Sequence, residues 1–243
     1  MSGFPATELA LIATAFVAAI VSGLAGFAFA LVAAGVFMHL LPPATAASVL
    51  IASVVLLQVW SLAHLRGAVS WPRVWPFLAG GVLGVPIGVA VVDRIDAATF
   101  RDLVGGFLVA YSVWMLLRPA PAPIVAGRAA DGAIGFVGGV MGGMVGFAGA
   151  VPTIWCGLRG WNKDEQRAVF QPYILAMQAL ALACLWAEGR IDRQAVTTFA
   201  LCAPAMALGV WLGLKLYARV DERRFRHIVL WLLLASGATL IAF

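Results

Sequence analysis

Long apolar stretches alternate with short polar segments along the whole chain. The apolar stretches cover about residues 6–41, 44–64, 74–92, 100–117, 131–157, 168–187, 195–217 and 225–243. A helix that crosses a hydrocarbon core of roughly 30 Å needs about 20 residues, and six of these eight stretches have the length for one crossing. The first and fifth are longer and contain glycine-rich interruptions, which predict helices that are broken or re-entrant inside a membrane.

The composition agrees with a membrane as the surrounding solvent. Hydrophobic residues make up 63% of the 243 residues and charged residues only 11%, whereas soluble domains contain about 25% charged residues. We therefore predict an all-α polytopic membrane protein that has the lipid bilayer as a partner. The net charge of +5 is spread over short loops. This pattern indicates membrane topology, so no nucleic-acid partner is expected.

The sequence shows no pattern of an enzyme or a metalloprotein. Its three cysteines, Cys156, Cys184 and Cys202, are isolated in apolar surroundings, and its three histidines lack metal-ligand spacing. No nucleophile-elbow, zinc-protease or phosphate-binding-loop motif is present. We expect no catalytic residue, no metal and no cofactor.

Similar residues recur in the same order in the two halves of the chain. Gly26-Phe27-Ala28 and Gly146-Phe147-Ala148 lie 120 residues apart, as do Gln58 and Gln178. This order predicts a duplicated unit of four segments, with a first membrane repeat over 1–118, a Pro-rich linker over 119–130 and a second repeat over 131–243. Further pairs recur at 125 residues: Gly84 and Gly209, Gly88 and Gly213, Asp96 and Asp221, and Phe100-Arg101 and Phe225-Arg226.

The distribution of basic residues distinguishes two topologies. If the first and fifth stretches each cross once, the 16 Lys and Arg residues divide 10 to 6 between the two sides. If each folds back as a re-entrant hairpin, they divide 12 to 4, with only Arg94, Arg101, Arg190 and Arg193 outside. The positive-inside rule favours the second arrangement, in which the two halves are inverted. Both topologies place the N- and C-termini on the outer side.

The two glycine breaks are the predicted solute site. A helix that is interrupted inside the bilayer has unpaired N–H groups where its second part begins, and the partial positive charge there attracts an anion. Gly26 and Gly146 let the main chain and the solute approach closely. Phe27, Phe29 and Phe147 are expected to wall the site.

Close helix packing is the alternative role for the glycines of the second half. Gly138, Gly142 and Gly146 have the small-residue spacing of packed membrane helices. We favour packing for the glycines within 138–143 and the solute site for Gly146 and Gly149. Pro152 is expected to help hold the second break open.

Two glutamines are the most informative polar side chains. Gln58 and Gln178 each lie inside an apolar stretch, where an unpaired amide costs a few kcal/mol. They are expected either to hydrogen-bond solute or water, or to join the second and sixth apolar stretches to each other. Ser53, whose hydroxyl can bond the preceding turn, and Gln171, nearer the end of its helix, are weaker candidates for the same site.

The most polar loop, Arg159–Arg167, closes the fifth apolar stretch. Asn162 can cap the helix that follows, with Asp164 and Glu165 in its first turn and Arg167 pairing nearby. Capping accounts for these residues, so a role in gating is the less favoured interpretation.

Several of these motifs together resemble one transporter family. Residues 26–33 followed by Pro42-Pro43, the glycines of 142–149, and the segments 163–168 and 220–226 resemble the sulfite exporter TauE/SafE family over nearly the whole chain. The resemblance implies a cytoplasmic-membrane transporter of two related halves that carries sulfite, sulfoacetate or other small organosulfur or organic anions. The chain departs from the family's commoner Gly-Gly-Gly-Pro pattern at 29–31 and 149–152, which leaves the particular anion open.

The sequence thus predicts a transporter of a small anion. The alternatives are a channel-like anion pore with a continuous polar lining and, less favoured, a non-transport membrane subunit. No acidic residue or lysine lies in the middle of an apolar stretch, so no built-in ion relay is visible. The direction of transport, the coupling ion and the oligomeric state, a homo-oligomer included, stay open. The predicted site residues are Gly26, Phe27, Phe29, Ser53, Gln58, Gly146, Phe147, Gly149, Pro152, Gln171 and Gln178.

Overall fold

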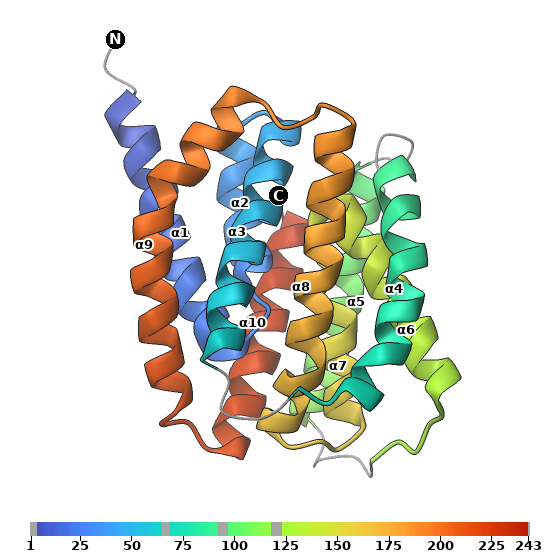
Figure 1. Ribbon diagram of the computed structural model, residues 1–243. Helices are drawn as coiled ribbons and strands as arrows, with labels where there is room; N and C mark the ends of the chain where they lie inside the picture. Colours follow the sequence, from blue (N-terminus) through green and yellow to red (C-terminus); the bar gives the residue numbers. More distant parts are fainter. Residues whose placement is uncertain (1–3, 65–68, 92–96, 118–122, 243) are drawn as a thin grey trace.

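The computed structural model describes residues 4–64, 69–91, 97–117 and 123–242, which form ten α-helices and no strand (Figure 1). Five of these helices, α1, α3, α4, α8 and α9, are long and apolar enough to cross a membrane. The prediction of an all-helical, multi-pass membrane protein is therefore confirmed. The helices are α1 (Phe4–Ala25), α2 (Phe29–Leu40), α3 (Pro43–Ala63), α4 (Trp71–Val91), α5 (Ala97–Leu117), α6 (Arg128–Val145), α7 (Ala150–Leu158), α8 (Lys163–Ala187), α9 (Arg193–Tyr217) and α10 (Glu222–Ala242).

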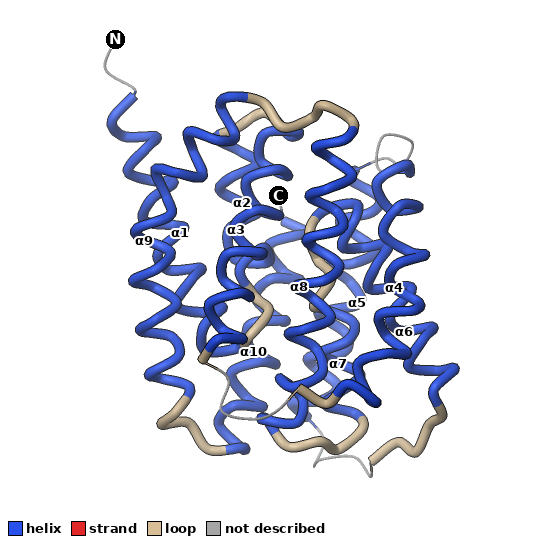
Figure 2. The backbone as a smooth tube through the Cα atoms, in the orientation of Figure 1, coloured by secondary structure: helices blue, strands red, loops and turns tan. Residues whose placement is uncertain are grey.

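The helices form one bundle with the loops gathered at its two ends (Figures 1 and 2). The starts of α4, α6, α8 and α10 lie at one end, whereas α1, α3 and α9 start at the other. Asp93, Asp96, Arg94, Arg118 and the first part of the predicted linker lie outside the described residues. We call the first end the basic end, because it carries Arg73, Arg128, Arg159, Lys163, Lys215, Arg219, Arg223, Arg224 and Arg226.

Large apolar side chains cover much of the outside of the bundle. Trp75, Leu83 and Trp186 are exposed by 67%, 66% and 76%. An apolar surface of this extent is stable when lipid covers it, because water would make it a site of aggregation.

Two helical segments are interrupted inside the bundle, where Figure 2 shows short tan stretches. The first break separates α1 from α2 and contains Gly26 at φ +93°, and the second separates α6 from α7 and contains Gly146 at φ +79°. Glycine adopts this left-handed conformation without the steric penalty of a side chain. At Gly146 it ends α6, whose last carbonyls accept from the N–H groups of Gly146 and Phe147.

The short helix α7 runs back along α6. A methyl group built on Gly142 would lie 2.8 Å from Cβ of Ala148, and one built on Gly138 would lie 3.0 Å from Cγ of Pro152. Residues on either side of the break therefore meet in antiparallel order. α2 likewise returns toward the end from which α1 starts (Figure 1).

Glycines also let two pairs of long helices approach closely. Between α4 and α6, a methyl group built on Gly84 would lie 2.3 Å from the carbonyl oxygen of Phe136. Between α1 and α9, a methyl group on Gly213 would lie 2.2 Å from the carbonyl oxygen of Ile20. A side chain at either position would collide with main-chain atoms that cannot turn away. The packing role expected for the glycines of 138–143 is observed, since Gly139 and Gly143 face α4 in the same way.

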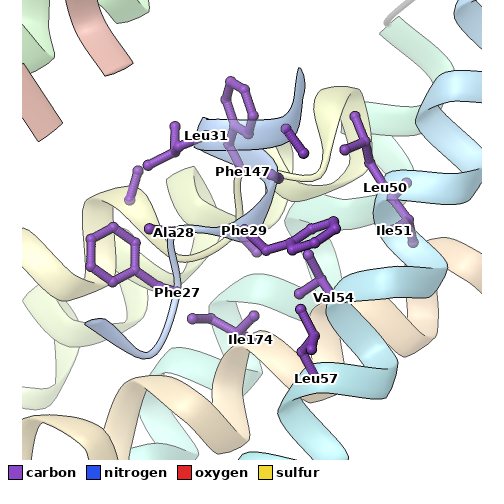
Figure 3. Packing of buried hydrophobic residues seen from close by; sticks show 14 of the residues in the cluster. Phe27, Ala28, Phe29, Leu31, Leu50, Ile51, Val54, Leu57, Phe147 and Ile174 are labelled. Atoms are coloured by element: carbon purple, nitrogen blue, oxygen red, sulfur yellow. The ribbon is translucent and has the colours of Figure 1, made fainter. Parts of the chain in front are cut away.

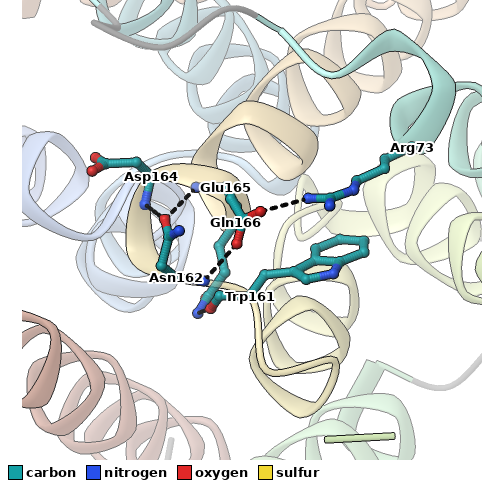
Figure 4. Close-up of polar contacts among 6 residues, drawn as sticks. All are labelled: Arg73, Trp161, Asn162, Asp164, Glu165 and Gln166. Atoms are coloured by element: carbon teal, nitrogen blue, oxygen red, sulfur yellow. Dashed lines mark hydrogen bonds and ion pairs between the residues drawn. The ribbon is translucent and has the colours of Figure 1, made fainter. Parts of the chain in front are cut away.

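The polar loop before α8 forms the cap that its sequence predicts (Figure 4). The Asn162 side chain accepts from the N–H groups of Asp164 and Glu165, and the Glu165 carboxylate accepts from the N–H of Asn162. Glu165 also pairs with Arg73 of α4 at 3.0 Å. This capping box fixes where α8 begins, and hence which of its side chains face the breaks.

A matched pair of alanine substitutions tests the helix contact between α4 and α6. Gly139→Ala places a methyl group 2.5 Å from the carbonyl oxygen of Gly81, so we expect a loss of about 1–3 kcal/mol in unfolding free energy. Gly106→Ala, on α5, meets nothing within 4 Å and should be neutral or stabilising by up to about 1 kcal/mol. Thermal unfolding in detergent checks both. Equal melting temperatures for the two variants would contradict the contact.

Candidate functional site

The two helix breaks meet in the centre of the bundle. A methyl group built on Gly149 would lie 2.8 Å from Cβ of Phe27, which belongs to the first break. One built on Gly146 would lie 3.9 Å from Cβ of Ala30, near the start of α2. The main chain of one break is thus packed against the other.

Each break is held by a glutamine from a neighbouring long helix. The side-chain Nε2 of Gln58, on α3, donates to the carbonyl oxygen of Gly26 at 2.7 Å. Gln178, on α8, donates in the same way to the carbonyl oxygen of Gly146 at 2.5 Å. Both pairs are 32 residues apart in the chain. The glutamines therefore bind the break of their own half, and among the described residues neither one hydrogen-bonds the long helix of the other.

These hydrogen bonds decide which amide atom is left over. A carbonyl oxygen can only accept, so each glutamine must turn its NH2 group toward the glycine. Gln58 and Gln178 are 1% and 0% exposed, and the Oε1 atom of each is buried with no partner among the described residues. An unpaired buried acceptor is costly. Each break thus carries a free oxygen that suits a hydrogen-bond donor.

The helices that follow the breaks begin without side-chain caps. The N-cap residues are Ala28 for α2 and Gly149 for α7, and neither helix has a side-chain hydrogen bond at its cap. Main-chain N–H groups in the first turn of a helix lack partners within that helix and carry a partial positive charge. In α7 the N–H of Ala150 donates to the carbonyl oxygen of Phe147 and Pro152 has no N–H, so Val151 supplies the free donor of this first turn. The breaks therefore combine free acceptors on the glutamines with main-chain donors on α2 and at Val151 of α7.

Aromatic side chains lie around the breaks (Figure 3). Phe27 and Phe147 are buried, and Phe27 packs edge-on against Phe170 of α8 with ring centroids 6.1 Å apart. Phe29 is fully buried and lies beside Val54 of α3. The site is accordingly an apolar enclosure with a few polar atoms at fixed positions.

Of the remaining predicted residues, Ser53 and Pro152 have contacts within their own helical segments, whereas Gln171 has none for its amide among the described residues. The Ser53 hydroxyl donates to the carbonyl oxygen of Val49, one turn earlier, at 2.6 Å, so it is satisfied locally. Pro152 packs on α6 beside Gly138. Gln171 is 0% exposed, and neither its Nε2 nor its Oε1 has a partner among the described residues. It is thus a stronger polar candidate than its place in the sequence suggests.

The structure adds Arg167, Phe170 and Ile174 of α8 to the surroundings of the breaks. Methyl groups built on Gly26 and Gly149 would touch Phe170 and Ile174. Counted from Arg167, the side chains of Phe170, Gln171, Ile174 and Gln178 stand at i+3, i+4, i+7 and i+11, the spacing of one helix face. That spacing was a signal available in the sequence.

The expectation that Arg167 pairs with a nearby charge in the polar loop was wrong. Arg167 lies inside α8, is 1% exposed, and donates to the carbonyl oxygens of Gly23 and Leu24 at 2.5 and 3.1 Å. These carbonyls belong to the last turn of α1, where a cation is stabilised by unpaired acceptors and by the helix dipole. The guanidinium thus links two helices that are far apart in the sequence, because α1 ends beside α8.

Two cavities near the basic end approach the breaks. One of about 960 Å³, between α5, α7 and α10, reaches Thr153 of α7, whose buried hydroxyl has no partner among the described residues. The other, of about 530 Å³, between α3, α8 and α9, is lined by Arg167. Each break therefore has a hollow on the side of the basic end.

The opposite end is tied together by Asp192. Its carboxylate caps α9 by accepting from the N–H of Ala195 at 2.6 Å, and the hydroxyl of Thr45 on α3 donates to it at 2.7 Å. The hydrogen bond from Thr45 first, and then that from Ala195, hold the pKa of Asp192 below its usual value. The ionised carboxylate thus joins the start of α3 to the start of α9.

Two broken helices that meet in an apolar enclosure, each held by a buried glutamine, are typical of the transporter class of membrane proteins. A family model described as Sulfite exporter TauE/SafE matches residues 11–240. The chain belongs to this family of membrane transporters, and the predicted resemblance is confirmed. Comparisons with curated proteins and with solved structures give no match. Among the described residues, no three His, Cys, Asp or Glu side chains gather where they could hold a metal.

Substitution of Gly149 tests whether the two breaks are in contact. In Gly149→Ala the new methyl group would lie 2.6 Å from Cδ1 of Ile174 and 2.8 Å from Cβ of Phe27, so we expect a loss of about 1–3 kcal/mol in unfolding free energy. Adding Ile174→Val removes the nearer atom and should restore part of the loss. Gly157→Ala, on the same short helix, meets nothing within 4 Å and is the control. Thermal unfolding that shows no difference between the two alanine variants would refute the contact.

Proposed function

We propose that the protein is a secondary transporter that moves a small anion, such as sulfite, an organosulfonate or a similar organosulfur or organic anion, across the cytoplasmic membrane. Membership of the TauE/SafE family supports the class of solute and the absence of an enzymatic role. The observation that carries the proposal is the meeting of two uncapped helix breaks, each held by a glutamine whose oxygen stays free.

The chemistry of this centre suits an oxyanion that also carries a hydrogen-bond donor. The first-turn N–H groups of α2 and the N–H of Val151 on α7 can donate to anion oxygens. The free Oε1 atoms of Gln58 and Gln178 can accept from an O–H or N–H group of the solute. Hydrogensulfite and amino- or hydroxy-substituted sulfonates provide both kinds of group. The glutamines and main-chain groups at the breaks are neutral, which favours release, because they do not hold the anion with a full opposite charge.

The two halves are proposed to be inverted repeats over 1–118 and 131–243. The reciprocal helix contacts support this relation, since α4 of the first half packs on α6 and α9 of the second half packs on α1. The glycines at these contacts include Gly84 and Gly88 on α4 and Gly209 and Gly213 on α9, which are the pairs 125 residues apart. The matched glutamine contacts support it further.

The basic end is proposed to face the cytoplasm, with both termini on the outer side. Of the Lys and Arg residues whose side chains the structure describes, only Arg190 and Arg193 lie at the opposite end. A carrier is favoured over a channel because Phe27, Phe29, Phe147 and Ile174 fill the space around the breaks. A channel requires a continuous polar lining instead.

Counterflow in proteoliposomes tests the transport proposal. With labelled sulfite, sulfoacetate, taurine and a carboxylate control, we expect saturable, trans-stimulated uptake that differs among the anions. Gln58→Ala and Gln178→Ala each remove the amide that holds a break and should reduce uptake by about tenfold or more.

Gln166→Ala is the matched control, since this amide in the first turn of α8 bonds the carbonyl oxygen of Trp161 in the preceding loop and not a break. It should transport like the wild type. Uptake that is unchanged in both Gln58→Ala and Gln178→Ala would remove the glutamines from the site, and flux without saturation would favour the channel.

Reporters at the two termini test the orientation separately. A fusion that is active only outside the cytoplasm should be active at both the N- and the C-terminus, because both ends are expected on the side opposite the basic loops. A reporter that requires the cytoplasm serves as the control. Cytoplasmic activity at either terminus would be incompatible with this orientation.

A further inference from the structure

Arg167 is a buried cation without an acidic partner. It is 1% exposed, and no carboxylate among the described residues pairs with it. Of the two acidic residues just before it in the chain, Glu165 pairs with Arg73, and Asp164 accepts from the hydroxyl of Tyr217 at 2.5 Å. A buried charge is costly unless an opposite charge or a full set of hydrogen bonds compensates it. This residue therefore differs from an ordinary structural ion pair.

The contacts of Arg167 hold its guanidinium in one orientation. One terminal nitrogen donates to the carbonyl oxygens of Gly23 and Leu24, and the Tyr217 ring lies 3.7 Å from Cζ. The Nε atom is buried with no partner, and a methyl group built on Gly26 would lie 3.0 Å from it. The guanidinium is thus fixed beside the first break with donor capacity left over.

The same side chain lines the cavity of about 530 Å³ between α3, α8 and α9, which we call the α9 vestibule. Ser61, His64, Lys163 and Lys215 also line it. Lys163 donates to the carbonyl oxygen of Val220, and Lys215 lies 3.5 Å from the centre of the Trp211 ring. Asp164 is the only acidic residue of the described lining, and its carboxylate accepts a hydrogen bond from the hydroxyl of Tyr217. The cavity has room for a small oxyanion with several waters at about 30 Å³ each.

Arg167 and Gln171 of α8 have no polar equivalents in the other half. At the separation of 120 residues that relates Gln58 to Gln178, Arg167 corresponds to Ala47 and Gln171 to Ile51. A cation followed by an unpartnered amide therefore leads from the α9 vestibule toward the breaks on α8 only. The backbone arrangement is matched between the halves, but the charge is not.

We propose that the α9 vestibule is a second, one-sided binding site for the oxyanion, in which Arg167 is the main ligand and Lys215 contributes charge at the wall. This inference rests on the proposed function for the identity of the solute. The site would load or release the anion at the basic end, next to the break at Gly26. A guanidinium binds an oxyanion through directed N–H groups as well as charge.

The test is a thermal-unfolding titration of the full-length protein in detergent, with sodium sulfite and with sodium chloride at equal ionic strength. A ligand that binds the folded state raises the melting temperature in a saturable way. We expect such a rise with sulfite beyond that with chloride. In Arg167→Gln the sulfite concentration for half of the rise should increase about tenfold or more.

Two further variants keep the test decisive if Arg167→Gln does not fold. Lys215→Gln leaves the contacts of Arg167 with α1 intact and should raise the half-effect concentration several-fold, about threefold or more. Arg224→Gln removes an exposed cation of the same end, paired with Asp221 at 3.4 Å, and should change nothing. An unchanged half-effect concentration in Lys215→Gln, together with an unchanged value in any folded Arg167→Gln, would overturn the proposal.

The same titration separates this site from the central one and from a lipid site. In Gln58→Ala/Gln178→Ala the sulfite effect that depends on Arg167 should persist, even if transport is lost or was never present. A sulfite effect that disappears in this double variant would place all anion binding at the breaks and refute the vestibule site. Stabilisation by added phosphatidylglycerol through Arg167, without any by sulfite, would identify a lipid headgroup site instead.

Discussion

One kind of hydrogen bond, from a glutamine side chain to a glycine carbonyl oxygen, stabilises the two helix breaks at the centre of this protein. Where a membrane helix breaks, its last carbonyls lose their partners, and hydrocarbon supplies none. Gln58 and Gln178 each donate an amide hydrogen to the carbonyl oxygen of the glycine at a break. A neutral amide does this without placing a charge in the bilayer. The cost is a second amide atom, Oε1, that stays buried and free at each break.

The close approach of the breaks depends on packing farther out in the bundle. Glycines bring α4 onto α6 and α1 onto α9 until backbone touches backbone. These contacts set the positions from which α2 and α7 fold back into the centre. The capping box at Asn162 then fixes where α8 begins, so that one face of α8 meets both breaks. The proposed solute site is therefore carried by rigid helices, although its own main chain is irregular.

The main-chain arrangement is similar in the two halves of the chain, but the charged side chains differ. The glutamine contacts and the glycine contacts occur in both halves, whereas Arg167 and Gln171 stand where the first half has Ala47 and Ile51. Both described cavities lie near the basic end. Opening a site alternately to the two faces of a membrane requires only the glutamine and glycine contacts that occur in both halves. A difference in anion affinity between the two faces requires residues that occur in one half only, such as Arg167 and Gln171. A ligand shifts the equilibrium between two conformations only if it interacts differently with each.

The sequence by itself determined the features that are local or periodic. The apolar stretches, the glycine breaks, the cap at Asn162 and the two glutamines follow from composition and spacing over short distances. The tertiary structure alone decided which surfaces meet. It showed that each glutamine binds the break of its own half and that the Ser53 hydroxyl bonds its own helix. It also showed that Arg167 lies inside α8 and binds the end of α1. Such pairings depend on residues far apart in the chain, and no local pattern specifies them.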